Sequence, residues 1–338
     1  MYEYHFLRQL SPNDERAINA FLKASNGFQY FQSPDYFNAC LKTRNLRPFY
    51  IIAKDTDTVV GVCMGYRQVQ IGLPLAGFLT SRNVIVGGPV VRDANPQLLN
   101  GLLETYHAKR PKSLHTQIRN GQDTSPFGAV VERNGFVYDD HLDIIIDLTQ
   151  PEEALWKAVH TKRRNEIRRA EKEGCRVVQQ TTPNALADCY QILTEVYQRA
   201  KLPLPEPDHF QAMLNKTTET TGLRLFTAVW DEKIIGCMLC IAWGDTLYDY
   251  YAGAYSRYYH KYPNDLLPWY VFRWAKANGF SRFDFGGAGK PGVPYGVRDY
   301  KKKFGGTLVN FGRYEQVHFP VLYRLATAGF ALWQRIKP

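Results

Sequence analysis

Residues 49–64 read FYIIAKDTDTVVGVCM, and residues 225–239 read LFTAVWDEKIIGCML. Each segment consists of an apolar run, a polar turn that contains Asp, two β-branched residues, a glycine and more apolar residues. Apolar, β-rich runs on both sides of a polar turn predict a β-hairpin. The two glycines, Gly61 and Gly236, are separated by about half of the 338-residue chain. This spacing indicates an internal duplication.

The segments that flank the two hairpins also match. Ser11-Pro12, Ser33-Pro34 and Thr182-Pro183 are N-cap signals that predict helices before the hairpins. After each hairpin the pattern predicts a strand, a helix and a second strand. We therefore predict an α/β (α+β) protein in which each half has a mixed central sheet flanked by helices. The expected domains are residues 1–150 and 151–316, followed by a C-terminal helix at 317–338.

The composition favours a folded, basic protein. Hydrophobic residues make up 45% of the chain, which is enough for packed cores. Lys+Arg 42 against Asp+Glu 32 gives a net charge of +10, which favours an anionic partner such as RNA, a nucleotide or an anionic membrane. The N-terminus lacks a secretory signal, so we expect a cytoplasmic protein. The six cysteines and eight histidines show no metal-ligand spacing, so neither a metal nor a cofactor is expected.

Four further segments are distinctive. Residues 31–37 read FQSPDYF, residues 87–90 read GGPV, residues 155–174 read LWKAVHTKRRNEIRRAEKEG, and residues 300–306 read YKKKFGG. With the order of elements, these segments resemble the FemABX family of aminoacyl-tRNA-dependent peptidyltransferases. The resemblance implies two tandem GNAT-like domains. It also implies transfer of an amino acid from aminoacyl-tRNA to the amine of a nucleotide-linked or lipid-linked peptidoglycan precursor.

The third of these segments predicts a basic helix from Trp156 to Arg176. The cluster formed by Lys162, Arg163 and Arg164 exceeds what the glutamates of the helix can neutralise. Such a cluster indicates contact with a phosphate backbone, and the resemblance makes tRNA the partner. Lys302 and Lys303 extend the predicted tRNA-binding set. The alternative is an amphipathic helix with a solvated charged face.

The stretch from residue 286 to residue 306 combines glycines with cations. Gly286 and Gly287 would let the backbone approach a substrate closely. By resemblance, Tyr300 and Lys301 match the family's Phe-Lys pair near the reaction centre. A lysine there would stabilise the oxyanion of the ester under attack or hold the tRNA terminus. The alternative is a surface loop with a solvated lysine run.

The strand end at residues 248–254 (YDYYAGA) supplies two more candidates. Alternation places Tyr248 and Tyr250 on one face of the strand and Asp249 and Tyr251 on the other. Tyr251 matches the family's Y-x-G strand end and is predicted to reach the site, with Asp249 as a candidate base. Arg199 matches the family's acceptor-phosphate arginine.

Two other functions stay open. GNAT enzymes that use acyl-CoA bind its pyrophosphate on a glycine-containing loop, through free N–H groups. The corresponding residues 255–264 (YSRYYHKYPN) contain no glycine, which disfavours CoA but permits an acyl carrier protein. The first alternative is therefore an N-acyltransferase that uses acyl-CoA or acyl carrier protein on an amine outside the cell wall. The second is a non-catalytic RNA-binding protein.

The tail at residues 318–338 is apolar with cationic ends. This pattern predicts a helix that packs back on the first domain. A shallow contact with a membrane surface, which would suit a lipid-linked acceptor, is the alternative.

Overall fold

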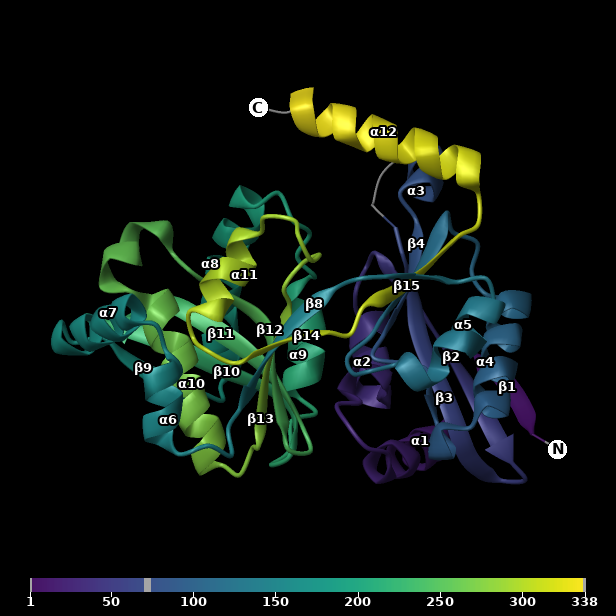
Figure 1. Ribbon diagram of the computed structural model, residues 1–338, viewed down its shortest axis with the longest axis horizontal. Helices are drawn as coiled ribbons and strands as arrows, with labels where there is room; N and C mark the ends of the chain where they lie inside the picture. The colour runs from purple at the N-terminus through teal and green to yellow at the C-terminus, as the bar shows by residue number, and fades with distance from the viewer. Residues whose placement is uncertain (1, 70–73, 337–338) are drawn as a thin grey trace. The chain divides into compact units, whose positions relative to one another are not determined.

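The computed structural model describes residues 2–69 and 74–336, and the chain forms two compact units (Figure 1). Residues 1–140 together with 311–338 form the first unit, and residues 141–310 form the second. The division lies earlier than the expected boundaries at 150 and 316. The reason is strand pairing, because β8 (Leu142–Asp147) belongs to the second sheet and β15 (Arg313–Val317) belongs to the first.

The first unit is built on an eight-stranded mixed sheet in the order β1-β2-β3-β4-β6-β15-β7, with β5 paired to β3. Its remaining strands are β1 (Glu3–Leu7), β2 (Leu46–Asp55), β3 (Thr58–Gln68), β4 (Arg82–Val86), β5 (Val90–Val91), β6 (His115–Arg119) and β7 (Val137–Asp139). Its helices are α1 (Pro12–Ala24), α2 (Pro34–Leu41), α3 (Pro74–Leu79), α4 (Pro96–Lys109), α5 (Gly128–Arg133) and α12 (Pro320–Ile336). The predicted caps Ser11 and Ser33 accept backbone N–H bonds at the starts of α1 and α2.

The second unit is built on a seven-stranded mixed sheet in the order β14-β8-β13-β12-β11-β10-β9. Its remaining strands are β9 (Arg176–Gln180), β10 (Thr221–Trp230), β11 (Lys233–Trp243), β12 (Thr246–Ala254), β13 (Arg282–Gly287) and β14 (Thr307–Asn310). Its helices are α6 (Glu152–Ala158), α7 (Thr161–Lys172), α8 (Pro183–Arg199), α9 (Pro207–Leu214), α10 (Pro263–Ala277) and α11 (Gly296–Lys302). The core of this unit gathers aromatic side chains from α10, β13 and the loop after α11, including Phe272, Phe283, Phe285 and Phe304.

Both predicted hairpins are confirmed, and they share a local irregularity. In β2–β3 and in β10–β11, the register shifts beside the glycine, at Gly61 and Gly236 respectively. A Cβ added at Gly61 would lie 3.4 Å from Leu102 of α4, and one added at Gly236 would lie 3.3 Å from Leu267 of α10. In each unit, therefore, the glycine lets the crossover helix pack closely on the hairpin.

The basic helix predicted from Trp156 to Arg176 is two helices, α6 and α7. His160 separates them, because its backbone is extended and its ring nitrogen accepts the N–H of Lys162 (3.2 Å) as an N-cap. The N–H of His160 donates to the carbonyl of Lys303 (2.8 Å). At this break the basic segment contacts residues 300–306. Helix periodicity in the sequence cannot predict this contact, because the two segments are far apart in the chain.

The C-terminal helix α12 contacts α3 within the first unit, and the rings of Phe78 and Phe319 lie 5.5 Å apart. Its first turns leave Val321 and Leu325 exposed at 71% and 64%. Among residues 2–69 and 74–336, we find no helix with both the length and the apolar character needed to span a bilayer.

Candidate active site

The second sheet opens between two neighbouring strands. β12 and β13 pair in parallel over only three positions, which end at Tyr248 and Asp284. Beyond this point β13 shifts its register against β8, and β12 shifts its register against β11 next to Tyr250. The two strand ends therefore diverge, and residues of both can approach a substrate at the opening.

Lys301 of α11 holds the end of β13. Its Nζ donates to the carbonyl oxygens of Phe285 (2.5 Å) and Gly287 (3.0 Å). Burial lowers the pKa of this ammonium group, and the charges of Asp249, Asp143 and Asp284 act in the opposite direction. The structure thus places the predicted Gly287 in contact with Lys301, and Asp249 within electrostatic range of it.

Asp249 on β12 has the electrostatic properties of a general base. Burial raises its pKa from 3.8 to about 6, Lys301 opposes this shift, and Asp284 adds to it. The side chain still keeps partial contact with solvent. A carboxylate with this pKa is ionised at neutral pH and is a stronger proton acceptor than an ordinary aspartate.

Asp284 is a site residue that the sequence reasoning missed. It is buried, burial raises its pKa, and its Oδ1 accepts the N–H of Gly286 (2.7 Å). The available signal was an acidic residue between Phe283 and Phe285 in an otherwise apolar strand. Gly286 has φ +66°, and a Cβ there would lie 2.7 Å from the hydroxyl of Tyr248. This glycine is therefore required by both its backbone conformation and its close packing.

Tyr300 and Arg163 form a second layer near this cluster. The Tyr300 hydroxyl donates to the carbonyl of Asn264, and the Arg163 guanidinium lies 5.2 Å from the Tyr300 ring centroid. Arg163 also pairs with Asp265 and with Glu166 (3.0 Å). Its side chain is only 17% exposed. These internal partners occupy its guanidinium and disfavour the predicted contact of Arg163 with tRNA.

Tyr251 lies in an aromatic cluster rather than opposite Tyr250. Alternation predicted opposite faces, but the two ring centroids are 4.6 Å apart. The cause is the register shift in β12, since a β-bulge turns consecutive side chains toward the same side. The Tyr251 ring packs against Tyr197 (5.2 Å) and Phe210 (5.1 Å). Burial raises the pKa of Tyr197, and the charge of Asp249 raises it further, so this cluster borders Asp249.

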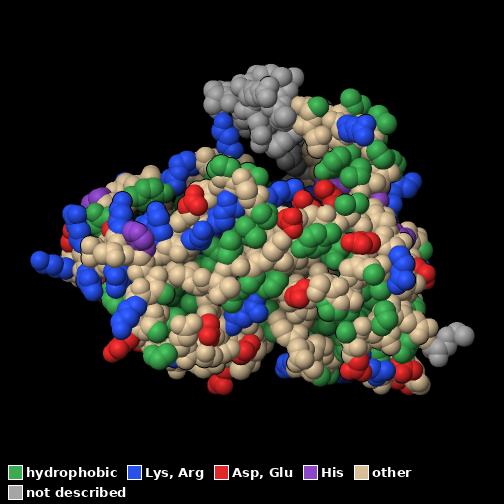
Figure 2. Space-filling model, in the orientation of Figure 1, with side chains coloured by type: hydrophobic (Ala, Val, Ile, Leu, Met, Phe, Trp, Pro, Cys, Tyr) green, Lys and Arg blue, Asp and Glu red, His purple; other side chains and the backbone are tan. Residues whose placement is uncertain are grey.

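The other predicted binding residues lie on the surface of the second unit. Lys162 is 71% exposed, the Arg164 guanidinium donates to Thr161 (3.1 Å), and Lys302 is exposed. Figure 2 shows Lys and Arg side chains gathered over α7. Arg199 at the end of α8 donates to the hydroxyl of Tyr259 (2.5 Å). None of these cations takes part in the Asp249–Lys301 cluster described above.

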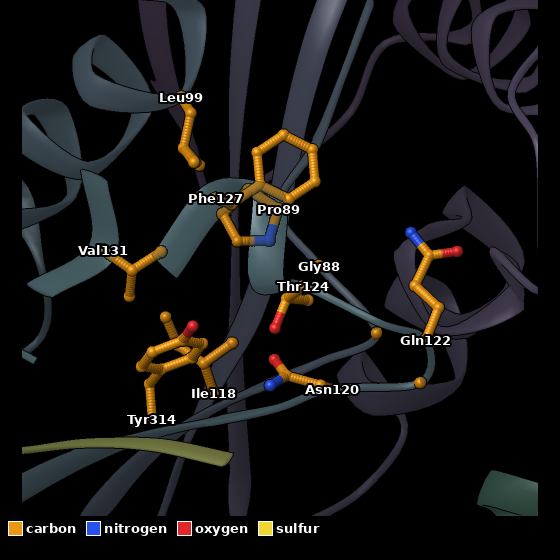
Figure 3. Close-up of a pocket in the computed structure, with 12 residues that line it drawn as sticks. Gly88, Pro89, Leu99, Ile118, Asn120, Gln122, Thr124, Phe127, Val131 and Tyr314 are labelled. Carbon is orange, nitrogen blue, oxygen red and sulfur yellow. The ribbon is translucent and has the colours of Figure 1, made fainter. Parts of the chain in front are cut away.

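The first unit also contains a pocket, located where β4 and β6 end (Figure 3). Its wall is apolar at Leu99, Ile118 and Phe127, and polar at Asn120 and Gln122. The lining contains no Lys, Arg, Asp, Glu or His. The pocket therefore offers no charged group for acid–base work, and the candidate chemistry lies in the second unit.

Comparison with known proteins matches this assignment of the chemistry. Residues 158–302 match the family described as an Acetyltransferase (GNAT) domain. No curated protein matches the sequence significantly. Among solved structures, FemX is similar over 96% of this chain and 99% of its own, with 15% identity and a TM-score of 0.72.

Two further solved structures are similar over most of the chain. The C-terminal domain of a putative lysylphosphatidylglycerol synthetase from Agrobacterium fabrum covers 93% of this chain and 95% of its own, with 12% identity and a TM-score of 0.61. A tandem GNAT protein from the clavulanic acid biosynthesis pathway is similar over 93% of this chain and 98% of its own, with 11% identity and a TM-score of 0.53. The chain thus has a FemX-like twin GNAT fold, and residues 158–302 of its second unit match a GNAT acetyltransferase domain.

Proposed function

Starting from a twin GNAT fold with an acyltransferase domain in its second unit, we propose that the chain transfers an aminoacyl group from aminoacyl-tRNA to the amine of a peptidoglycan precursor peptide. The observation that carries this proposal is that Asp249 and Lys301 lie within electrostatic range of each other beside the opening between β12 and β13. A proton acceptor and a cation at one sheet opening are what direct aminolysis of an ester requires.

The proposed step balances without a metal or a nucleotide. The amine nitrogen of the acceptor attacks the ester carbonyl, a C–N bond forms, and the C–O bond to the tRNA ribose breaks. Asp249 accepts the proton that the amine loses and returns it to the ribose oxygen, which leaves as a hydroxyl. Lys301 already donates to two carbonyls, and its ammonium group has a third N–H donor for the developing oxyanion.

The loop between β12 and α10 supports a donor other than acyl-CoA. Three of its backbone N–H groups are already engaged: Tyr255 donates to Ile235 (3.1 Å), Tyr258 to Tyr255 (3.0 Å) and Ser256 to the carboxylate of Glu195 (2.9 Å). Free N–H groups are what a pyrophosphate needs in such a loop.

The basic face of α7 supports an RNA donor. Arg163 is excluded from this face, so the proposed contacts are Lys162, Arg164 and Lys302, with Lys303 behind them. Exposed cations of this kind bind phosphates with an affinity that falls as salt concentration rises. One structural neighbour is named as a putative lysylphosphatidylglycerol synthetase, and that name describes the attachment of an amino acid to an acceptor.

For the acceptor, we assign Arg199 to its phosphate and α12 to a lipid surface. Arg199 is 46% exposed, and the hydroxyl of Tyr259 orients its guanidinium. The exposed apolar residues of α12, with no Asp or Glu between residues 316 and 338, suit an interfacial helix on an anionic membrane. Binding of the full chain to phosphatidylglycerol vesicles, weakened by Leu325→Asp, is the expected result.

A transfer assay tests the proposal. The purified chain is incubated with labelled aminoacyl-tRNAs and with nucleotide-linked or lipid-linked muropeptides, and the label is followed by mass spectrometry. Label on the muropeptide that ribonuclease abolishes supports the proposal and identifies the amino acid. Acylation that needs acyl-CoA or acyl carrier protein instead contradicts it. If the wild type binds RNA but shows no transfer, and Asp249→Asn and Lys301→Met bind RNA equally well, the chain is a non-catalytic RNA-binding protein.

A further inference from the structure

An open groove on the second unit lies away from the Asp249–Lys301 cluster. Its volume of about 930 Å³ is within the range of small-molecule binding sites, about 300–1,000 Å³. Its walls are the end of β9, the connection between α9 and β10, the start of β10, and the end of α10 with Phe280. Phe280 precedes the start of β13, whereas the active-site opening lies beyond Asp284 on that strand. The groove is therefore a separate site.

The aromatic wall of this groove is fixed in place. The Nε1 of Trp274 on α10 donates to the side-chain oxygen of Gln179 on β9 (3.0 Å). The Trp274 ring stacks on Phe280, with 5.8 Å between the ring centroids, and packs edge-on against Phe226 of β10 (4.9 Å). These contacts hold the indole in one orientation, so the groove has a preformed aromatic surface.

The connection between α9 and β10 is also held in place. Arg224 is only 6% exposed, and its guanidinium donates to the carbonyl oxygens of Thr218 (2.5 Å), Glu219 (2.8 Å) and Thr221 (3.2 Å). A buried guanidinium that binds three carbonyls orders this segment without help from a ligand. The second wall of the groove is therefore preformed as well.

The groove has little to offer an anion. Arg224 is the one cation among the described residues that line it, and backbone carbonyls engage its guanidinium. Glu219 is the one acidic residue of this lining, and its side chain is exposed. In a chain with a net charge of +10, this surface therefore does not favour the phosphate ligands that suit the basic face of α7.

Three amide side chains of the lining each use one polar atom within the protein. Gln179 accepts from Trp274 as described above. Gln180 donates through Nε2 to the hydroxyl of Thr227 (3.1 Å), and Asn278 donates through Nδ2 to the carbonyl of Trp274 (2.8 Å). Within residues 2–69 and 74–336, the other polar atom of each amide has no hydrogen-bond partner. The lining thus presents one N–H donor and two oxygen acceptors in fixed positions.

Two hydroxyl groups add to this set. Thr181 and Thr220 line the groove and are exposed, and in the described parts of the chain their hydroxyls take part in no hydrogen bond. A hydroxyl both donates and accepts. The groove therefore combines neutral donors and acceptors with a fixed aromatic ring.

We propose that this groove binds a neutral saccharide. Sugar hydroxyls donate and accept at closely spaced positions, which matches a lining of amides and hydroxyls, and the C–H face of a sugar ring packs against an aromatic ring. A lipid tail would bury the amides and hydroxyls without partners. The site is independent of the proposed transfer reaction, since it involves none of the residues assigned to that reaction.

A peptide that adds to the edge of the sheet is the competing ligand. β9 is the outermost strand at this edge, and an added strand would run along its length. Of the five residues of β9, however, only the last two, Gln179 and Gln180, line the groove. The groove lies across the end of the strand, which favours a compact ring over an extended chain.

Saturation-transfer NMR on the full chain tests the proposal. The saccharide probes are N,N′-diacetylchitobiose, cellobiose and maltose, tetra-alanine is the peptide probe, and pyrophosphate is the anion probe. We expect at least one saccharide to bind with a dissociation constant in the millimolar range or tighter. Tryptophan fluorescence should change during the same titration, and this change should be absent in Trp274→Phe. Binding of tetra-alanine alone, binding of pyrophosphate alone, or no saccharide binding overturns the proposal.

Variants locate the bound saccharide. Thr181→Val and Thr220→Val remove hydroxyls that have no internal partner, so they should leave the fold intact and weaken binding by about threefold to tenfold each. Thr220→Trp places an indole in the groove and should abolish binding. The matched control is Thr307→Val, because Thr307 is exposed on β14 at the other edge of the same sheet. Saccharide affinity that is the same in all of these variants would place the ligand elsewhere and overturn the proposal.

Discussion

At the scale of single residues, two opposing effects act on the carboxyl group of Asp249. Burial and Asp284 raise its pKa, while the ammonium group of Lys301 lowers it, and the result is a pKa of about 6. Burial alone would raise the pKa of Asp249 further and favour the neutral acid. A closer ion pair with Lys301 would lower the pKa and leave a carboxylate that accepts a proton weakly. The observed balance leaves a carboxylate that is ionised at neutral pH and still accepts a proton readily.

The activity of this residue should depend on pH. We expect kcat/KM for transfer to rise through an apparent pKa near 6 and to level off above it, because the base must be ionised. Asp249→Asn should reduce transfer by about a hundredfold or more and remove this inflection. The control is Asp231→Asn in the exposed turn between β10 and β11. An unchanged pH profile in Asp249→Asn would assign the base to another group.

The same carboxyl group should affect stability in the opposite sense to an ordinary ion-paired aspartate. Its pKa is raised on folding, so the native state binds more protons between pH 3.8 and about 6, and its contribution to stability falls as pH rises through this window. Asp249→Asn should therefore raise the free energy of unfolding at pH 8, by on the order of 2 kcal/mol. Below about pH 4 the difference should disappear. Denaturant titrations at both pH values measure it, and a destabilised variant at pH 8 would contradict the assignment.

At the scale of single elements, neighbouring arginines of α7 have different roles because α6 ends before it. The break at His160 turns Arg163 toward Asp265, which is only 6% exposed, while the half-buried Arg164 donates to Thr161 and has no ion pair within residues 2–69 and 74–336. Sequence periodicity identifies the basic character of this segment. It does not identify the break, because the carbonyl of Lys303 that holds His160 comes from a distant part of the chain.

These two roles predict opposite phenotypes. Arg163→Gln should lower the free energy of unfolding by about 3 kcal/mol, since it leaves a buried carboxylate without its partner. Its effect on RNA affinity should be small. Arg164→Gln should leave stability unchanged within about 0.5 kcal/mol and should weaken RNA binding and its salt dependence. Thermal denaturation and filter binding of both variants test this, and equal losses of RNA affinity would contradict the internal role of Arg163.

The hairpin glycines predict a second effect at this scale. In Gly236→Val the added side chain meets Pro263 and Leu267 of α10, whose atoms lie 3.0 Å and 3.3 Å from the position of the new Cβ. We expect a loss of about 1–3 kcal/mol in the free energy of unfolding, because α10 must move away from the sheet. Gly296→Val is the control, since a Cβ there meets nothing within 4 Å. Equal stability of the two variants would show that the close packing at Gly236 is unimportant.

At the scale of the whole molecule, much of the architecture could be predicted from the sequence. The repeated hairpins around Gly61 and Gly236, the proline-marked helix starts and the order of elements follow from local patterns. The exchange of strands at the domain boundaries could not be predicted, because β8 and β15 are short strands whose partners are decided by long-range pairing. For the same reason the sequence does not show the bulge that places Tyr251 beside Tyr250. The only sequence signal for Asp284 is its position between Phe283 and Phe285.

The position of β15 in the first sheet predicts the effect of a truncation. A chain that ends at Asn310 lacks β15, which lies between β6 and β7 in the first sheet. The second unit, residues 141–310, remains whole and should fold. The first unit should lose its cooperative transition, and limited proteolysis should cut within residues 111–140 of the truncated chain but not of the full chain. Equal protection of this segment in both chains would show that β15 is dispensable.

The position of β15 also bears on how the protein is made. A ribosome synthesises residues 1–140 before the second unit, yet β15, which lies inside the first sheet, emerges only after the whole second unit. The second unit can complete its own sheet while the first still has β6 and β7 without the strand between them. The domain that is translated first is therefore the one that finishes folding last. Until β15 emerges, the open strand edges of the first unit would be the part of the nascent chain most in need of a chaperone.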